Sequence, residues 1–298
     1  MMARIDADRI RERVQTLPML PAAVHELMVA FRDEDVGFDD LARKIDIDPA
    51  ITARILRVAN SSFYGMSGSI ATVGDAIRLI GLRTVETIVM QESLAQPFHG
   101  PGCPTFDFSK YWEHSLATAI AAQELARESG HAMNEAFTAG LIHDLGSLAL
   151  ASHFPQEYSA VVHDARDRDL PRIDAERASL GIDHCQVGAW IAAHWHFTEP
   201  VIDAIAWHHN PGHRSIEDED SDGVVEPAPR RPDPASLADL VHNADGIAHA
   251  LDLHPAGDDL VPPMQRASWD RLPLSTETFL RLFRRVEIAF REIRHGLR

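Results

Sequence analysis

The chain has little cysteine. Cys103 and Cys185 are the only two cysteines among 298 residues, which excludes the disulfide framework of a small secreted domain and points to a reducing compartment. The segment from Met1 to Asp6 contains no apolar run, so no secretory signal peptide is expected. These absences together predict a cytoplasmic protein.

Long apolar runs and basic residues are also scarce. No run approaches the roughly 18 apolar residues of a membrane-spanning helix, so no membrane partner is expected. Lysine and arginine total 28 against 45 aspartates and glutamates, and the formal net charge is −17. Such a chain lacks the basic face with which proteins grip nucleic acid or an anionic membrane, so nucleic acid is not an expected partner.

The pattern of apolar residues predicts an all-α fold. Hydrophobic residues make up 45% of the chain, enough for a substantial core, and they recur at helical spacing nearly everywhere, without convincing strand-like alternation. Asp48-Pro49 is a typical helix start, and Gln96–Thr105, with three prolines and two glycines, is a candidate boundary between two lobes. Residues 211–235 combine an acidic run with several prolines, a composition typical of disorder.

One apolar stretch, Ala136–Leu150, contains an adjacent imidazole and carboxylate, His143-Asp144. A single helix is expected near residues 134–150, and it would place this pair on or beside a buried face, where a carboxylate must be paired or bound to a cation. Two interpretations compete: a metal-ligand pair, or a self-satisfied polar pair in a helical core. The dipeptide alone decides nothing, since His163-Asp164 repeats it in a polar stretch.

Further donors follow the same pattern of helices. His114 precedes the pair, His184 and the adjacent His208-His209 follow it, and Asp245 lies in a later apolar helix. Helices from distant parts of a bundle commonly converge such ligands on one interior point, and of two adjacent imidazoles one can face a metal while the other orients a neighbour. A glycine four residues after His184 would let another helix approach closely.

The order His … His-Asp … His … His-His … Asp is similar to that of the HD superfamily of metal-dependent phosphohydrolases. More specifically, the chain resembles the HDOD domain, the HD-related output domain of bacterial signalling proteins, from Leu17 to about Pro211. The segments that carry this resemblance are Asp48–Gly65, Ala76–Gly81, Tyr111–Ser115 and Ala139–Gly146, followed by Glu176, Gly181, His184, Trp195 and His208-His209.

The resemblance implies a two-lobed helical bundle: an N-terminal helical lobe over residues 1–100, an HD-like lobe over 106–211, an acidic, proline-rich disordered insertion over 212–235, and C-terminal helices over 236–298 that complete the HD-like lobe. It also implies one or two divalent ions, Fe, Mn, Zn or Mg, as the only cofactors. The implied metal ligands are His114, His143, Asp144, His184, His208, His209 and Asp245.

The chain departs from the catalytic cyclic-dinucleotide phosphodiesterase branch, HD-GYP, at three places. That branch has a lysine where this chain has Ser147, a glutamate ligand where it has Lys110, and a Gly-Tyr-Pro element where it has Asn210-Pro211. Because the lysine would help to neutralise a phosphate, its loss removes part of substrate binding while most of a metal site remains.

The leading prediction is therefore a non-catalytic bacterial signalling module that acts through signalling proteins, with no residue assigned a catalytic role. The alternative is a metal-dependent phosphohydrolase that takes a nucleotide or phosphate ligand. DNA binding through two short helices in residues 38–60, with Arg54 and Arg57 offered to a groove, is a third interpretation. The apolar stripe of the last helix, Ser275–Leu297, suits either the core or a dimer face, so a homo-oligomer is also open.

Overall fold

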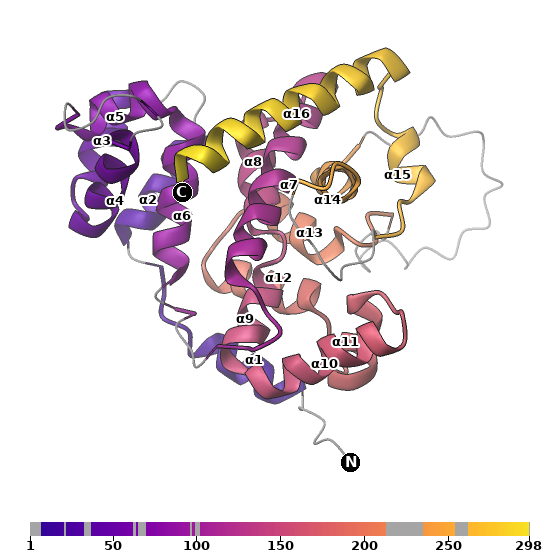
Figure 1. The fold of residues 1–298 in the computed structure, drawn as a ribbon. Helices are drawn as coiled ribbons and strands as arrows, with labels where there is room; N and C mark the ends of the chain where they lie inside the picture. The colour runs from indigo at the N-terminus through magenta and orange to yellow at the C-terminus, as the bar shows by residue number, and fades with distance from the viewer. Residues whose placement is uncertain are drawn as a thin grey trace, which may run out of the picture.

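The computed structural model describes residues 7–20, 22–32, 37–61, 64, 70–95, 97–98, 102–212, 235–253 and 262–297. Across these residues the chain forms helices and no strand, which confirms the predicted all-α class (Figure 1). The acidic, proline-rich segment predicted over 212–235 lies, apart from its two end residues, outside the described part. No described helix is both long enough and apolar enough to span a membrane.

The helices, in chain order, are α1 (Ala7–Gln15), α2 (Ala22–Arg32), α3 (Phe38–Ile45), α4 (Pro49–Ala59), α5 (Val73–Ile80), α6 (Leu82–Ala95), α7 (Phe108–Ser129), α8 (Met133–Ile142), α9 (Leu145–His153), α10 (Pro155–Asp167), α11 (Arg172–Leu180), α12 (His184–His194), α13 (Glu199–Trp207), α14 (Leu237–Ala250), α15 (Arg266–Asp270) and α16 (Thr276–Leu297).

Local chemistry sets several helix starts. The Asp48 side chain accepts hydrogen bonds from the amides of Ala50 and Ile51, with Pro49 in the first turn, as the sequence predicted. Asp107 caps α7 in the same way, through the amides of Ser109 and Lys110. These caps satisfy amides that have no partner within the helix.

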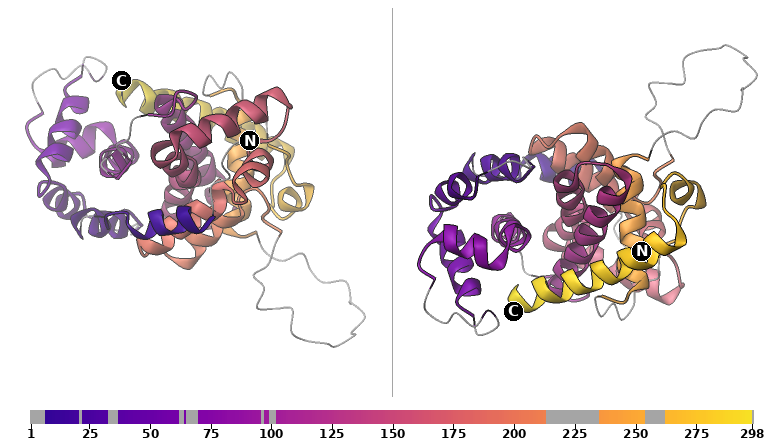
Figure 2. Two further views of the ribbon diagram at one scale, coloured as in Figure 1. Left: turned by 90° about the horizontal axis from the view of Figure 1, so that it is seen from below. Right: turned by 90° about the horizontal axis from the view of Figure 1, so that it is seen from above.

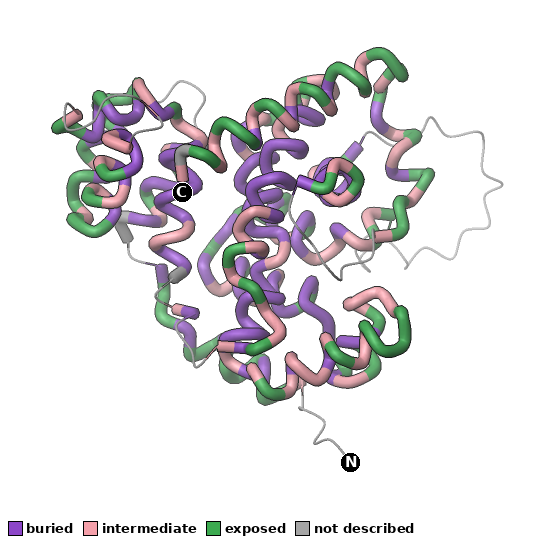
Figure 3. The backbone as a smooth tube through the Cα atoms, viewed as in Figure 1, coloured by how far each residue is buried: buried purple, intermediate pink, exposed green. Residues whose placement is uncertain are grey.

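Helices α2 to α6 pack on one another, and α7 is the central helix of the remainder, in contact with α8, α14 and α16 (Figures 1 and 2). Helix α1 lies apart from α2 and packs against α12. The indole of Trp195 donates to the carbonyl of Pro18 at 3.1 Å, which ties the chain between α1 and α2 to the end of α12. Buried residues are concentrated on the helices around α7 (Figure 3).

The expected single helix near residues 134–150 is wrong. The structure has two helices: α8 ends at Ile142, α9 begins at Leu145, and His143-Asp144 forms the turn between them. The carbonyl of Asp144 accepts from the amide of Ser147, which starts a new helix. All residues from Ala136 to Leu150 except Asp144 are buried, so the apolar pattern alone could not reveal the break.

The break brings α9 against α12 at very close range. A Cβ added to Gly146 would lie 1.9 Å from the carbonyl oxygen of His184 and 2.7 Å from the amide nitrogen of Gly188. A Cβ on Gly188 would in turn lie 2.8 Å from the Ile205 side chain. The expected close helix approach at Gly188 is therefore confirmed, and two glycines, rather than one, permit it.

Helices α3 and α4 form as expected, but the Arg54 side chain is already engaged. Its guanidinium lies 3.6 Å from the carboxylate of Glu92 and donates to the carbonyl of Leu297 at 3.3 Å. Arg54 is therefore packed between α6 and α16 rather than presented to a DNA groove, which counts against the DNA-binding interpretation.

Candidate metal centre

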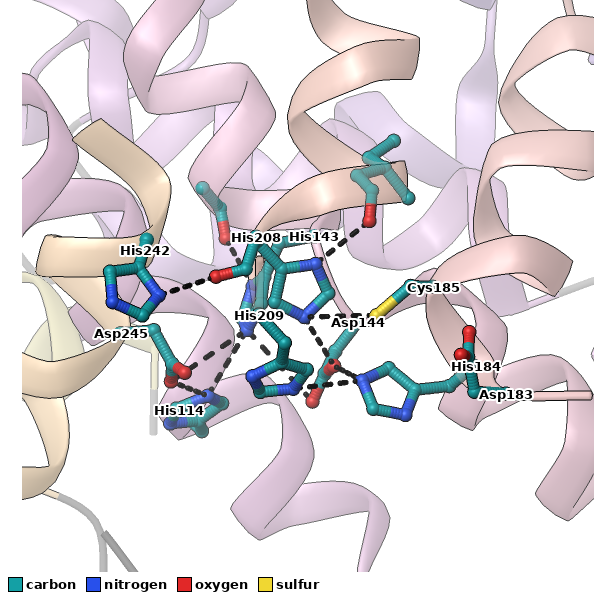
Figure 4. Close-up of polar contacts among 12 residues, drawn as sticks. His114, His143, Asp144, Asp183, His184, Cys185, His208, His209, His242 and Asp245 are labelled. Carbon is teal, nitrogen blue, oxygen red and sulfur yellow. Dashed lines mark hydrogen bonds and ion pairs between the residues drawn. The ribbon is translucent and has the colours of Figure 1, made fainter. Parts of the chain in front are cut away.

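The structure brings all seven predicted ligands together (Figure 4). His114 comes from α7, His143 and Asp144 from the turn between α8 and α9, and His184 from the first position of α12. His208-His209 closes α13, and Asp245 comes from α14. Segments distant in sequence thus supply one cluster. That these residues are metal ligands remains a prediction.

One half of the cluster consists of His114, His143 and Asp245. The Nε2 atom of His114 lies 3.2 Å from Nε2 of His143 and 3.1 Å from Oδ1 of Asp245. His143 and Asp245 are almost completely buried, at 1% and 2% exposure. Two imidazoles and a carboxylate at these distances are a donor set typical of a divalent transition metal.

The other half consists of His184, His208 and His209. The Nε2 atoms of His184 and His209 lie 3.1 Å apart, and the ring of His208 stacks near both. Asp144 lies between the two halves: its Oδ2 is 3.9 Å from Nε2 of His143, and its Oδ1 is 3.3 Å from Nε2 of His184. Its carboxylate can therefore reach an ion in either half.

Three imidazoles are held in the cluster from behind. The Nδ1 atom of His143 lies 2.8 Å from the carbonyl of Gly140, and Nδ1 of His208 lies 2.8 Å from the carbonyl of Ile205. A carbonyl oxygen can only accept, so Nδ1 carries the proton in both rings. When the ring is neutral, as His143 is with its pKa of about 4, Nε2 carries an unprotonated lone pair directed into the cluster.

His184 has the same arrangement with a stronger acceptor. Its Nδ1 donates to the carboxylate of Glu176 at 2.6 Å, and Glu176 is completely buried. A carboxylate behind a ligating imidazole fixes the ring orientation and raises its basicity toward a metal. Glu176 also accepts from the backbone amide of His184 at 2.8 Å, which holds it in place.

These lone pairs fit a cation. The Nε2 atom of His184 faces the Asp144 carboxylate at 3.3 Å, and Cys185, Glu176 and Asp144 outweigh burial and raise the pKa of His184, so positive charge is favoured at this position. The buried Oδ1 of Asp245 lies 3.1 Å from Nε2 of His114 and 3.4 Å from Nε2 of His249, so one carboxylate oxygen faces two imidazole nitrogens. The residues present therefore suit a divalent metal in each half, and protonated imidazoles are the other source of the positive charge that the carboxylates favour.

Burial and mutual charge shift the pKa values strongly. Burial lowers the pKa of His143 to about 4, although Asp144 partly opposes this. For His208, burial is outweighed by the thiol group of Cys185, whose ionised form raises the His208 pKa to about 9. For Asp144, burial is outweighed by the surrounding imidazoles, and its pKa lies well below the ordinary value. The cluster thus favours an ionised carboxylate among neutral and charged imidazoles.

A cavity of about 820 Å³ opens onto the cluster. His114, Asp144 and Asp245 lie in its wall, and Asp144 retains 14% side-chain exposure. Four basic side chains also line it, in an otherwise acidic protein: Lys110, Arg166, Arg172 and Arg177. The cavity is large enough for a nucleotide-sized molecule.

Sequence reasoning missed some members of the site. Cys185 adjoins His184, and its sulfur lies 3.8 Å from Nε2 of His208. His249, one turn after Asp245, places Nε2 3.4 Å from Oδ1 of that carboxylate. His249 follows Asp245 at i+4 in a predicted helix, and this spacing could have indicated it. Glu176 carried part of the family resemblance, but nothing in the sequence placed it behind His184.

Comparison with known proteins gives a consistent result. The HDOD domain family matches residues 17–211. A protein of Treponema pallidum (strain Nichols), described as uncharacterized, is 26% identical over 214 residues, which cover 71% of this chain but 41% of that protein. The chain therefore spans about two-fifths of the length of this relative.

Solved structures share the fold. An HDOD domain protein from Geobacter sulfurreducens matches with a TM-score of 0.67 and 22% identity over 98% of both chains. A "putative signal transduction protein" from Marinobacter aquaeolei VT8 matches with a TM-score of 0.74 and 22% identity over all of this chain and 61% of the other. A "putative phosphohydrolase" from Shewanella amazonensis SB2B matches with a TM-score of 0.65 and 25% identity over 96% of both chains.

Proposed function

Because this chain belongs to the HDOD domain family, we propose that it is a bacterial signalling module whose His/Asp cluster holds divalent metal without hydrolysing a phosphate ester. The observation that carries the proposal is the environment of Ser147. Ser147 is completely buried, and it is not among the residues that line the cavity. The position at which the catalytic branch carries a phosphate-binding lysine therefore supplies no cation to a substrate.

A second departure supports the same conclusion. Lys110, one turn before His114 on α7, stands where the catalytic branch has a glutamate ligand, and it lines the cavity. An ammonium group there would disfavour a bound cation rather than ligate it. A metal held by the remaining donors would have a structural or sensory role.

We further propose that the chain has two lobes. Residues 1–100 would form the N-terminal lobe, residues 106–211 and 236–298 the HD-like lobe, and residues 212–235 an insertion between them. The packing of α2 to α6 on one another supports this division, whereas α1 packs against α12 of the HD-like lobe. The partner would be a signalling protein, and several large apolar side chains exposed in the N-terminal lobe, among them Val29, Phe38 and Ile47, offer it a contact surface.

Helix α8 is suited to connect the two lobes. Its C-terminal end leads into His143, whereas its Thr138 hydroxyl donates to the buried carboxylate of Glu86 on α6 at 2.8 Å. The guanidinium of Arg83 on α6 also lies over the ring of Phe137. Metal binding at His143 would therefore bias the packing of α8 on α6, which is a physical route between the site and the partner surface.

The test combines metal analysis with a search for turnover. Purified protein loaded with Mn²⁺ or Fe²⁺ is expected to bind metal and to leave cyclic dinucleotides and phosphomonoesters unhydrolysed. His143→Ala should lose the metal. Turnover by the loaded protein that His143→Ala abolishes would overturn the proposal, and so would a wild-type chain that binds no Mn²⁺, Fe²⁺ or Zn²⁺.

The second candidate function, a metal-dependent phosphohydrolase, is favoured by one observation. Arginine side chains of α10 and α11 line the cavity that Asp144 also lines, where they would meet an anionic substrate. A divalent metal bound there would supply Lewis acidity toward a phosphate ester. The named Shewanella structure is consistent with this alternative. The turnover assay above distinguishes the two.

A further inference from the structure

The deepest part of the cluster contains a sulfur atom. Cys185 and His208 are 2% and 0% exposed, and neither is among the residues that line the cavity. Cys185 follows His184 on α12, and its side chain points at the ring of His208 beside Asp144 (Figure 4). A soft donor therefore lies behind the nitrogen and oxygen donors that face the cavity.

The spacing of these atoms suits one ion. Single donor atoms of His184, Cys185, His208 and His209 all lie within 4.8 Å of one another. Nε2 of His184 lies 3.1 Å from Nε2 of His209, and Sγ of Cys185 lies 3.8 Å from Nε2 of His208. In a tetrahedral zinc site, with Zn–N near 2.0–2.1 Å and Zn–S near 2.3 Å, neighbouring ligand atoms lie about 3.3 to 3.6 Å apart.

We propose that the Cys185 thiolate is a metal ligand, so that His184, Cys185, His208 and His209 form a thiolate-containing subsite distinct from the His114, His143 and Asp245 subsite. This inference rests on the proposed metal function of the cluster. The lone pair of His208 Nε2, fixed by the Nδ1 bond to Ile205, faces the sulfur and would coordinate the same ion. The thiol proton leaves to solvent as the metal binds.

The two subsites then differ in the metals that they prefer. Thiolate selects zinc and other soft or borderline ions, whereas two imidazoles with a carboxylate also accept manganese or iron. The proposal therefore predicts that the chain binds Zn²⁺ or Co²⁺ first through the subsite that contains Cys185. The other subsite would take the harder ion.

Cobalt substitution tests the assignment. Wild-type protein titrated with one equivalent of Co²⁺ should show a thiolate-to-cobalt charge-transfer band in the near ultraviolet, and Cys185→Ser should lack the band. Zn²⁺ affinity of Cys185→Ser, measured by chelator competition, should fall by at least about tenfold, since even residues that only orient ligands cost 10- to 100-fold.

The chain provides a matched control. Cys103 is the only other cysteine, is equally buried, and contacts Thr105 and Ser159 instead of the cluster. Cys103→Ser should keep both the band and the affinity. If Cys185→Ser fails to fold, X-ray absorption at the zinc edge of the wild-type protein replaces it, and one sulfur neighbour at about 2.3 Å is expected.

Failure of the metal function and failure of the thiolate assignment give different results. A wild-type chain that binds neither Co²⁺ nor Zn²⁺ overturns the metal function itself. A chain that binds metal through nitrogen and oxygen only, with the same spectrum in Cys185→Ser, overturns the thiolate ligand and leaves the metal function intact.

Discussion

Backbone carbonyls and one buried carboxylate decide how the imidazoles of this site behave. The Nδ1 atoms of His143 and His208 each donate a hydrogen bond to the backbone carbonyl three residues earlier. The Nδ1 atom of His184 donates to the carboxylate of Glu176. Each ring is therefore fixed before any ion arrives, which lowers the cost of binding. Removing a group behind a ring should weaken metal binding although that group never touches the ion.

Glu176→Gln tests this at the residue scale. An amide in place of the carboxylate weakens the hydrogen bond to His184 Nδ1 and lowers the basicity of the ring, so metal affinity should fall about 10- to 100-fold. Chelator competition with Zn²⁺ measures the effect. Tyr158→Phe is the control, because it removes only the hydroxyl that donates to the other oxygen of Glu176 at 3.2 Å. Equal losses in both variants would contradict a role specific to the His184 ring.

The pH dependence of the metal-free protein should follow His143. Its pKa is lowered from 6.5 to about 4, so the unfolded chain binds a proton in this window that the folded chain does not. The free energy of unfolding should therefore fall as the pH drops from 6.5 to 4, by up to about 3 kcal/mol from this group. His209 and His242, whose pKa values are also lowered by burial, add to the loss.

Groups with raised pKa values do not change this direction. His208, with a pKa of about 9, is protonated in both states below pH 6.5 and contributes its own pH dependence only above that value. Urea unfolding at pH 7 and pH 4.5 measures the slope. His143→Gln should show a smaller slope than the wild type, and an unchanged slope would contradict the assignment.

At the scale of the helices, the break at His143-Asp144 matters most. Two short helices with a turn between them can direct both side chains into the cluster, whereas adjacent residues on one helix point about 100° apart. The sequence favoured one helix because apolar residues fill the whole stretch. Gly146 in α9 lies against the backbone of α12, and a contact between segments so distant in sequence cannot be read from the periodicity of one stretch.

Gly146→Ala should disrupt the contact between α9 and α12. The added methyl group would collide with the backbone of His184, which cannot move aside as a flexible side chain would. A loss of about 3 kcal/mol or more in the free energy of unfolding is expected, beyond the usual cost of overpacking. Thermal and urea denaturation measure it. Gly212→Ala is the control, because its Cβ would meet only the Gln265 side-chain oxygen at 3.9 Å and should change little.

The coupling of α8 to α6 makes a separate prediction. Hydrogen exchange with and without Zn²⁺ should show added protection in α6 as well as in the helices that carry the ligands, because Thr138 and Glu86 join α8 to α6. Thr138→Val should keep the protection near the ligands and lose it in α6. Protection confined to the ligand-bearing helices of the wild type would contradict the connection.

For the whole molecule, the helical class and the convergence of seven donors followed from sequence pattern and resemblance. Cys185 did not, because a lone buried cysteine carries no distinguishing signal until the fold sets its neighbours, and His249, although its i+4 spacing from Asp245 was visible, was one of 17 histidines. The role of Glu176 was also hidden, since it depends on the register of α11 against α12. The contacts of the Arg54 side chain likewise could not be predicted from the sequence, because they depend on where α16 packs.

A metal that binds only the folded chain should stabilise the whole fold. At a free ion concentration 100 times the dissociation constant, the gain is about 2.7 kcal/mol, or roughly 5 °C in melting temperature for a chain of this size. Calorimetry with Zn²⁺ or Mn²⁺, reversed by a chelator, measures it. His114→Ala combined with His184→Ala removes a donor from each half and should abolish the shift, and a shift that survives this double change would place the ion elsewhere.

The donors of the cluster lie far apart in the chain, and this limits when the site can form during folding. His114 and Asp245 meet only after a long loop has closed and α14 has docked on α7. An ion in the subsite of His114, His143 and Asp245 therefore cannot nucleate the chain; it captures molecules that have already assembled and slows their opening. In a cell, metal supply would then set how long the folded protein survives rather than how fast it forms.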